Sequence, residues 1–351
     1  MRPVVVFGGY GAFGAHVARE LARLGHVVTI AGRNRGKAEA GAAGLGPQHH
    51  AVAADVADPV SCRAALAGQS VAVSCAGPFS AQGEALLHAC LASRCHYADI
   101  ADDRAHCARV RGWGGRFREA GLTAAYGCSS LPGLSGALAL LAQEGADAPA
   151  RRARVALFIG NRNHKGPAAV RSAVRGMGRP ISAPQGNLKG FADPVVVGLP
   201  PPFGRRSLYN FDGPEYDLFP ALLGVSSVVV KVGFEMRIAT RAFAALAALS
   251  SRYGDRTGWL LAGLGALSSG IGHSGGAVMA ELTWADGTVR GAALTCAEDG
   301  QRMAALPCAL AASALASGEP SRAGAATAYE LLGHQGLLEG MARRGFAPLR
   351  L

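Results

Sequence analysis

The sequence lacks the patterns that mark zinc-binding, disulfide-rich and nucleic-acid-binding proteins. Its eight cysteines include no C-x-x-C pair with histidine partners, so neither a metal site nor a disulfide framework is expected. The basic residues include only four lysines and form no run of five or more, and no nucleic-acid-binding motif is present. Nucleic acid is therefore not an expected partner.

Long hydrophobic runs are also missing. The longest apolar stretches, residues 243–250 and 258–271, are shorter than the roughly 20 residues of a membrane-spanning helix, and the charged segment 251–257 separates them. We interpret residues 243–271 as buried helices or as the lining of an apolar cleft, and membrane contact is the less favoured interpretation. No signal-peptide pattern precedes the strand expected at Val4, so we expect a cytoplasmic protein.

The composition is that of a globular protein with two domains. Of the 351 residues, 50% are hydrophobic and 17% are charged, which excludes a largely disordered chain and supplies enough apolar surface for two cores. The formal net charge of +11 would help to attract an anionic small molecule.

Strands and helices alternate over residues 1–127. Short β-branched runs, suited to buried parallel strands, are each followed by a stretch with apolar residues at helical spacing. The expected strands cover residues 4–7, 27–31, 50–54, 71–74, 97–100 and 123–126, and the expected helices cover 12–24, 37–43, 61–66, 82–93 and 104–120. This alternation predicts an α/β domain, a Rossmann-type doubly wound parallel sheet.

Residues 128–325 show a different pattern, which predicts a second domain. A helix is expected at 135–144, and strands are expected at 153–159, 195–197, 226–235, 276–283 and 288–297, the last two joined by a hairpin at 285–288. This order indicates an α+β domain with a mixed, largely antiparallel sheet. The C-terminal segment 326–351 is expected to form a helix that packs back on the first domain.

A glycine-rich loop follows the first strand and opens the first helix. It reads Gly9-Tyr10-Gly11-Ala12-Phe13-Gly14, the G-x-G-x-x-G pattern of dinucleotide-binding domains. Gly9 would permit the tight turn, Gly11 would let a pyrophosphate approach the backbone, and Gly14 would let the helix pack close to the strand. The helix N-terminus would offer free N–H groups to the phosphates. The alternative is a structural turn that tolerates glycine.

The end of the second strand indicates which dinucleotide binds. An NAD site usually carries an acid there, but this sequence has Gly32, followed by Arg33, Asn34 and Lys37. A 2′-phosphate requires a cation and no competing carboxylate, so NADP is favoured over NAD. The alternative is that these residues are solvated at a helix start, which we expect for Arg35.

Two later strand ends complete the predicted cofactor site. Asp55 and Val56 end the third strand, where the carboxylate of Asp55 can reach an adenine amino group or can simply stabilise a turn. The fourth strand ends in a turn expected beside the nicotinamide ribose, because ligands bind at the carboxyl ends of strands at the switch point of the sheet. That turn contains Cys75, Ala76, Gly77, Pro78 and Phe79.

Candidate substrate-binding residues lie in the second domain. Arg162, with His164 and Lys165, belongs to "GNRNHKG", and Arg205 and Arg206 belong to "FGRRSLYNFDGPEYDLFP". An Arg fork suits a substrate carboxylate, whereas an ion pair with an acid of its own loop would explain Arg206 without a ligand. His273 in "GHSGG" is interpreted as structural.

Several of these stretches together resemble the saccharopine dehydrogenase-like oxidoreductases. The resemblance rests on "GGYGAFG", on "AGRN", on "CAGPF" with the following "GEALLHACLASRCHYADIADD", and on "GCSSLPGLSGALA". It implies an NADP-binding domain followed by a second domain with a mixed sheet, often used to form a homodimer. It also implies hydride transfer between NADP(H) and a carbon–nitrogen bond, without identifying the substrate.

The resemblance and the strand ends together give three candidate catalytic residues. The resemblance implies that Cys128, before the Pro-Gly turn, corresponds to a cysteine of the amino-acid reductases in this family; a small buried residue is the alternative. Tyr97 and Asp99 lie at a strand end, where they could exchange protons with a ligand. The alternative for Asp99 is an acid cluster that caps the following helix. Phe79 stands where saccharopine-forming relatives have an aromatic hydroxyl, so their detailed mechanism does not transfer.

The leading functional hypothesis is an NADP(H)-dependent oxidoreductase acting on an imine, amino-acid-like or carbonyl substrate. A second hypothesis is an enoyl or carbonyl reductase for an apolar, lipid- or polyketide-like substrate, suggested by residues 243–271. A third is a non-catalytic NADP(H)-sensing protein, because no unambiguous acid–base pair is present. The sequence does not choose the substrate or the direction of the reaction.

Overall fold

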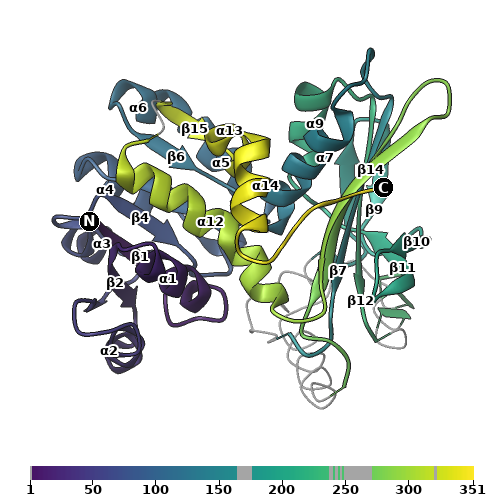
Figure 1. Cartoon of the computed structure of the whole chain (residues 1–351). Helices are drawn as coiled ribbons and strands as arrows, with labels where there is room; N and C mark the ends of the chain where they lie inside the picture. Colours follow the sequence, from purple (N-terminus) through teal and green to yellow (C-terminus); the bar gives the residue numbers. More distant parts are fainter. Residues whose placement is uncertain are drawn as a thin grey trace. The chain divides into compact units, whose positions relative to one another are not determined.

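The structure is a computed structural model that describes residues 2–163, 176–236, 240–241, 244–245, 247–248, 271–319 and 322–351. The chain divides into two compact units (Figure 1). Unit 1 contains residues 1–133 and 304–340, and unit 2 contains residues 134–303 and 341–351. The predicted boundary after residue 127 lies a few residues before this division.

Unit 1 is built on a seven-stranded sheet in which every neighbouring pair is parallel. The strand order is β15-β6-β5-β4-β1-β2-β3. Successive strands are added outward from β1 in one direction and then, from β4, in the other, so the switch point lies between β1 and β4. The strands are β1 (Pro3–Phe7), β2 (Val27–Gly32), β3 (His50–Ala53), β4 (Val71–Ser74), β5 (His96–Asp99), β6 (Thr123–Ala125) and β15 (Gly324–Ala326). The predicted Rossmann-type fold is confirmed.

The central strands are apolar on both faces because helices cover both faces of the sheet. Val4, Val5 and Val6 of β1 and Val71 and Val73 of β4 are all fully buried. The helices and helical turns of residues 1–134 are α1 (Gly14–Arg23), α2 (Arg35–Ala43), α3 (Pro59–Leu66), η1 (Phe79–Ala81), α4 (Ala85–Ala92), α5 (Arg104–Gly112), α6 (Gly114–Glu119) and η2 (Ser130–Leu134).

The C-terminal part of the chain returns to unit 1 earlier than the sequence predicts. Helix α12 (Gly300–Ser317) enters unit 1 at residue 304, and β15 adds the seventh strand by pairing with β6. Helices α13 (Ala328–Leu332) and α14 (His334–Ala342) follow. Residues 341–351 belong to unit 2, where β16 (Leu349–Arg350) pairs with a strand of the unit 2 sheet.

Unit 2 contains a mixed seven-stranded sheet in the order β10-β11-β12-β7-β13-β14-β16. Only β12 and β7 are parallel neighbours, and the other pairs are antiparallel. Its strands are β7 (Arg152–Ile159), β10 (Val195–Leu199), β11 (Gly204–Asn210), β12 (Ser227–Phe234), β13 (Gly276–Thr283), β14 (Val289–Cys296) and β16. A small hairpin, β8 (Pro180–Ala183) and β9 (Gly186–Lys189), stands apart from it. The predicted mixed, largely antiparallel sheet is confirmed.

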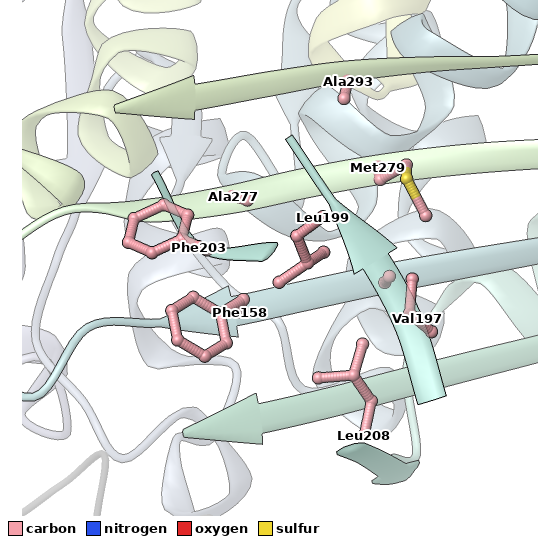
Figure 2. Close-up of a cluster of buried hydrophobic side chains, with 9 residues drawn as sticks. Phe158, Val197, Leu199, Phe203, Leu208, Ala277, Met279 and Ala293 are labelled. Atoms are coloured by element: carbon pink, nitrogen blue, oxygen red, sulfur yellow. The ribbon is translucent and has the colours of Figure 1, made fainter. Parts of the chain in front are cut away.

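Each face of the unit 2 sheet buries apolar side chains. One face carries a cluster centred on Phe158 of β7, Leu208 of β11 and Met279 of β13, with Val197 and Leu199 of β10 packed across it (Figure 2). Helix α7 (Ser135–Gln143) packs against β13 and β14, and α9 (Glu215–Leu223) packs against β12.

Most of the predicted apolar segment 243–271 lies outside the described residues, so its proposed role as a cleft or a core stays a prediction. Among the helices that the structure describes, none has both the length and the apolar character needed to cross a membrane.

Candidate functional site

The glycine loop lies at the switch point of the unit 1 sheet. Gly8 has a φ of +74°, and a Cβ on it would lie 3.0 Å from the backbone of Cys75 and Ala76, in the loop after β4. The residue of this turn with a positive φ is therefore Gly8, one residue before Gly9, to which we assigned the tight turn. At Gly9 the constraint is space, because a Cβ there would lie 2.8 Å from Ile30 Cδ1.

The surroundings of the other two glycines are those that the predicted access and close packing require. Around Gly11, a Cβ would meet only the Gly8 carbonyl oxygen, at 3.1 Å, so this side of the loop is open. A Cβ on Gly14 would overlap the same carbonyl oxygen, so the first turn of α1 packs directly on the loop. The N-cap residue Phe13 makes no side-chain cap hydrogen bond, and the first turn of α1 carries no acid. The helix N-terminus is thus suited to a phosphate.

Tyr10 leaves no room for an acidic side chain at position 32, the last residue of β2. A Cβ on Gly32 would overlap the ring of Tyr10, and the Tyr10 hydroxyl accepts a hydrogen bond from the Asn34 N–H at 3.3 Å. The place where an NAD-binding carboxylate usually stands is therefore filled by an aromatic ring. Sequence reasoning included Tyr10 in the cofactor site without giving it this role.

Of the polar and charged side chains after β2, some have hydrogen-bond or ion-pair partners among the described residues and others have none. Asn34 caps α2, because its Oδ1 accepts a hydrogen bond from the Lys37 N–H at 2.9 Å. Arg35 pairs with Glu39 at 2.8 Å, as expected of a solvated side chain. Arg33 and Lys37 are exposed, and no ion pair engages either of them among the described residues. Arg33 directly follows the strand end and is the better placed cation for a 2′-phosphate.

The third strand end leads into a turn. Asp55 Oδ1 accepts a hydrogen bond from the Ala57 N–H at 3.0 Å, which is the turn role that we considered as the alternative. Asp58 caps α3 through the N–H groups of Val60 and Ser61. Val56 is half-buried. Contact of Asp55 or Val56 with an adenine stays a prediction.

The loop after β4, residues 75–79, is held by side chains that sequence reasoning missed. Gln82 Nε2 donates to the Ala76 carbonyl oxygen, and Arg109 donates to the Gln82 carbonyl oxygen at 2.7 Å. The buried Phe79 ring lies 5.0 Å from the ring of His106. Cys75, Ala76 and Pro78 are half-buried and Gly77 is exposed. The role of Gln82 could have been predicted only from its being a polar residue shortly after the Gly-Pro turn.

Two of the predicted catalytic residues, Tyr97 and Asp99, meet in a buried cluster with His106. Asp99 Oδ1 accepts hydrogen bonds from the N–H groups of Ala101 and Gly127, at 3.0 and 2.8 Å. His106 Nε2 lies 3.2 Å from Asp99 Oδ2 and 3.3 Å from the Tyr97 hydroxyl. The cap of α5 is instead Asp103, which accepts from the His106 N–H at 2.8 Å, so Asp99 is not the capping acid. Nothing in the sequence indicated a role for His106 except its position on the helix that follows this strand.

Cys128 joins this cluster through its backbone. Its N–H donates to the Asp99 carbonyl oxygen at 2.9 Å. Burial and the nearby Asp99 carboxylate raise the pKa of the Cys128 thiol well above its usual value, and they raise the pKa of Tyr97 in the same way. Both groups are therefore neutral at pH 7.

The predicted substrate-binding arginines lie at different places in unit 2. Arg205 and Arg206 are on strand β11 rather than in a loop, so they face opposite sides of the sheet. Arg205 is exposed, whereas the Arg206 guanidinium lies 5.3 Å from the centre of the Phe158 ring and its Nε is buried without a partner among the described residues. Arg162 is exposed after β7, and His164 and Lys165 lie outside the described residues.

The family comparison agrees with the geometry of unit 1. The family described as the saccharopine dehydrogenase NADP binding domain matches residues 4–125, the stretch from β1 to β6. Residues 4–125 of unit 1 are thus a domain of the saccharopine dehydrogenase NADP-binding type. NADP is the cofactor of this domain, as the sequence predicted. The open side of Gly11, the N-terminus of α1 and the exposed Arg33 are the features of this saccharopine dehydrogenase-type domain that fit it.

Comparison with solved structures extends the likeness in fold to the whole chain. A saccharopine dehydrogenase (L-Glu forming) from Saccharomyces cerevisiae aligns over 100% of this chain and 99% of its own, with a TM-score of 0.67 and 13% identity. A short-chain type dehydrogenase/reductase from Mycobacterium ulcerans aligns over 36% of this chain and 66% of its own, with a TM-score of 0.31 and 17% identity. No curated protein matches the sequence. At 13% identity, the first likeness establishes the shared fold and not the activity.

Proposed function

We propose that the protein is an NADP(H)-dependent oxidoreductase that reduces, or forms by oxidation, a C=N or C=O bond of a small substrate. The observation that carries this proposal is the position of the Asp99 cluster in unit 1. It lies at the end of β5, and Phe79 connects it to the loop after β4 at the switch point. When bound, NADPH supplies the hydride.

The residues of unit 1 would bind and orient the reactants. The glycine loop would hold the pyrophosphate, Arg33 would pair with the 2′-phosphate, and the loop at 75–79 would bind the nicotinamide ribose. Reduction of an imine adds a hydride to carbon and a proton to nitrogen. We propose that Tyr97 and Cys128, both neutral, are candidate donors of that proton, and that Asp99 and His106 hold them in place.

We propose unit 2 as the substrate domain and a homodimer as the assembly. An imine or amino-acid-like substrate is supported by two cations of unit 2, Arg162 after β7 and Arg206 on β11. An apolar carbonyl or enoyl substrate would depend on residues 243–271, most of which lie outside the described residues. Size-exclusion chromatography with light scattering tests the homodimer, and a monomeric mass at micromolar concentration would reject it.

A second candidate function, NADP(H) sensing without catalysis, is favoured by one observation. Tyr97, Asp99 and Cys128 are at most 1% exposed, so each would need a change around it to touch a ligand. A sensor would bind NADPH and leave it unoxidised.

One experiment separates the two functions. NADPH binding is measured by fluorescence, and NADPH oxidation is followed against a panel of imines, 2-oxo acids with amines, aldehydes, ketones and enoyl compounds. An oxidoreductase should turn over at least one compound, and Tyr97→Phe should lower kcat about 10²-fold or more with NADPH affinity unchanged. Tight NADPH binding without oxidation across the whole panel would establish the sensor instead.

A further inference from the structure

The end of β2 is covered by a side chain of the glycine loop, Tyr10. A Cβ on Gly32 would overlap Tyr10 Cε1 and would lie 2.7 Å from the Tyr10 hydroxyl oxygen. The hydroxyl therefore lies where an acidic side chain at position 32 would begin. In an NAD site, an acid at this strand end binds the ribose 2′-hydroxyl. This protein presents a phenol hydroxyl in the same place.

Tyr10 is held in this position from both ends. The Gly11 N–H donates to the Gly8 carbonyl oxygen at 2.8 Å, which closes the turn that contains Tyr10. At the far end of the side chain, the hydroxyl accepts a hydrogen bond from the Asn34 N–H at 3.3 Å. Between the two, a Cβ on Gly41 of α2 would lie 3.7 Å from Tyr10 Cβ, so the side chain runs beside that helix. The hydroxyl is therefore positioned by the protein itself.

The Tyr10 hydroxyl still has a proton to donate. A tyrosine hydroxyl can accept one hydrogen bond and donate another at the same time. The bond from Asn34 uses its oxygen as the acceptor, and no acceptor for its proton is present in the part of the chain that the structure describes. The donor is thus available to a ligand at the end of β2.

Arg33 adds a positive charge next to this donor. It lies between Gly32 and Asn34, the two residues that contact the Tyr10 side chain. Arg33 is exposed, and no described acid forms an ion pair with it. A hydrogen bond to an ionised acceptor is roughly twice as strong as one to a neutral acceptor. A hydroxyl donor beside a cation therefore suits a phosphate better than a ribose hydroxyl.

We propose that Tyr10 determines cofactor specificity together with Arg33. The Tyr10 hydroxyl would donate to the 2′-phosphate of NADP(H), and the Tyr10 ring would prevent an acidic side chain at position 32 from binding NAD(H). One side chain would thus favour one cofactor and disfavour the other. The inference rests on the proposed function only in placing the 2′-phosphate beside Arg33, and it involves no catalytic step.

Removing the hydroxyl while keeping the ring tests the first role. The affinities of the full chain for NADPH and NADH are measured by fluorescence titration. Tyr10→Phe should weaken NADPH binding about tenfold and change NADH binding less than twofold, because NADH has no 2′-phosphate. Tyr209→Phe, in an apolar cluster of unit 2, is the matched control and should change neither affinity. If Tyr10→Phe left NADPH binding unchanged, or weakened both cofactors equally, the proposal would be rejected.

The 2′-phosphate itself provides a second readout. A hydrogen bond to the charged form of a group favours that form, so a donor to the dianionic phosphate should lower its pKa. Phosphorus NMR of bound NADP⁺ at several pH values follows this titration. In Tyr10→Phe the 2′-phosphate should become protonated at a higher pH than in the wild-type protein, whereas Tyr209→Phe should match the wild type. The same titration in Tyr10→Phe and the wild type would show that the hydroxyl does not bind the phosphate.

Introducing the acid tests the role of the ring. Gly32→Asp alone should weaken NADPH binding without improving NADH binding, because the Tyr10 ring occupies the space that the new side chain needs. In the double variant Tyr10→Ala/Gly32→Asp the carboxylate has room, and NADH should bind at least tenfold more tightly than to Gly32→Asp. If Gly32→Asp alone bound NADH as tightly as the double variant, the ring would not exclude the acid.

These measurements separate cofactor specificity from catalysis, because all of them follow binding. The expected differences between NADPH and NADH in a protein that oxidises no compound of the panel would count against the proposed function alone. Turnover of a substrate with equal NADPH affinity in the wild type and Tyr10→Phe would reject the role of Tyr10 alone.

Discussion

At the scale of single residues, the glycine loop shows that each glycine has its own physical requirement. Gly8 has a positive φ, Gly9 and Gly14 leave no room for a Cβ, and Gly11 leaves one side of the loop open. These are separate constraints, so replacing each glycine should have a different consequence.

The sharpest test is Gly14→Ala, because its Cβ would overlap the Gly8 backbone. We expect a loss of about 1–3 kcal/mol in the free energy of unfolding and at least tenfold weaker NADPH binding. Gly36→Ala is the matched control, since the nearest atom to its Cβ is 3.7 Å away and Ala favours helix by up to about 1 kcal/mol. Chemical denaturation and fluorescence titration measure both. A Gly14→Ala protein as stable as the Gly36→Ala protein would contradict this packing.

The choice between NADP and NAD should depend on Arg33. Arg33→Asp removes the cation and introduces a carboxylate near the ribose, so NADPH affinity should fall by tenfold or more and the NADPH preference should reverse. Arg35→Asp is the control, because Arg35 is already paired with Glu39. Titration of each variant with both reduced cofactors gives the ratio of affinities. An unchanged ratio in Arg33→Asp would remove Arg33 from the cofactor site.

The cofactor could be predicted from the sequence because short motifs indicate it. The G-x-G-x-x-G loop is such a motif, and the missing acid at Gly32 led to NADP. The sequence could not show that Tyr10 fills the space beside Gly32. Glu235 and His273 are 38 positions apart, and only the pairing of three strands brings them together. Contacts of that kind depend on register, which a single sequence specifies poorly.

At the scale of elements, β12 contains a buried lysine whose pKa is lowered by its burial. The Lys231 side chain is 3% exposed and donates to Asn210 Oδ1 at 2.7 Å and to the Asp193 carbonyl oxygen. Burial lowers its pKa to about 8, although the nearby Asp193 carboxylate partly opposes the shift. The folded state therefore binds this proton more weakly than the unfolded state does.

This difference predicts how stability depends on pH. Between pH 8 and 10.5 the unfolded chain keeps the proton while the folded chain has released it, so stability should rise with pH over that window. The shift from 10.5 to about 8 corresponds to about 3 kcal/mol as an upper limit. Urea unfolding at pH 7, 8.5 and 10 should show this rise in the wild-type protein relative to Lys231→Met. If the free energy of unfolding changed with pH in the same way in both proteins, burial would not lower the pKa of Lys231.

The elements themselves were predicted best where strands and helices alternate regularly. All six strands expected in residues 1–127 are present. Strands β11 and β15 were missed because their residues carry no alternating apolar pattern: β11 begins with Gly-Arg-Arg, and β15 has only three small residues. Such segments become strands only because a neighbouring edge offers them hydrogen-bond partners, which is tertiary information.

At the scale of the whole molecule, unit 1 is assembled from two separate stretches of the chain. From the sequence we predicted two domains and expected only residues 326–351 to pack back on the first domain. In the structure, His26 Nε2 is hydrogen-bonded to Ser313 Oγ at 2.8 Å. The Gly324 N–H donates to the Leu122 carbonyl oxygen, and the Tyr126 N–H donates to the Ala326 carbonyl oxygen. These contacts join residues 304–340 to the N-terminal Rossmann core, so neither stretch is a complete folding unit.

This organisation predicts how fragments should behave. Residues 1–133 alone should bind NADPH poorly, because the edge of β6 is left unpaired and the contacts to α12 are lost. The same residues joined to 304–340 by a flexible Gly/Ser linker should fold and bind NADPH within about threefold of the full chain, since all the residues that we propose to contact the cofactor lie within unit 1. Hydrogen exchange of the Gly8–Gly14 amides, with and without NADPH, reports both folding and binding. If residues 1–133 alone bound NADPH as tightly as the joined fragment, the C-terminal stretch would be an attachment to unit 1 and not part of its fold.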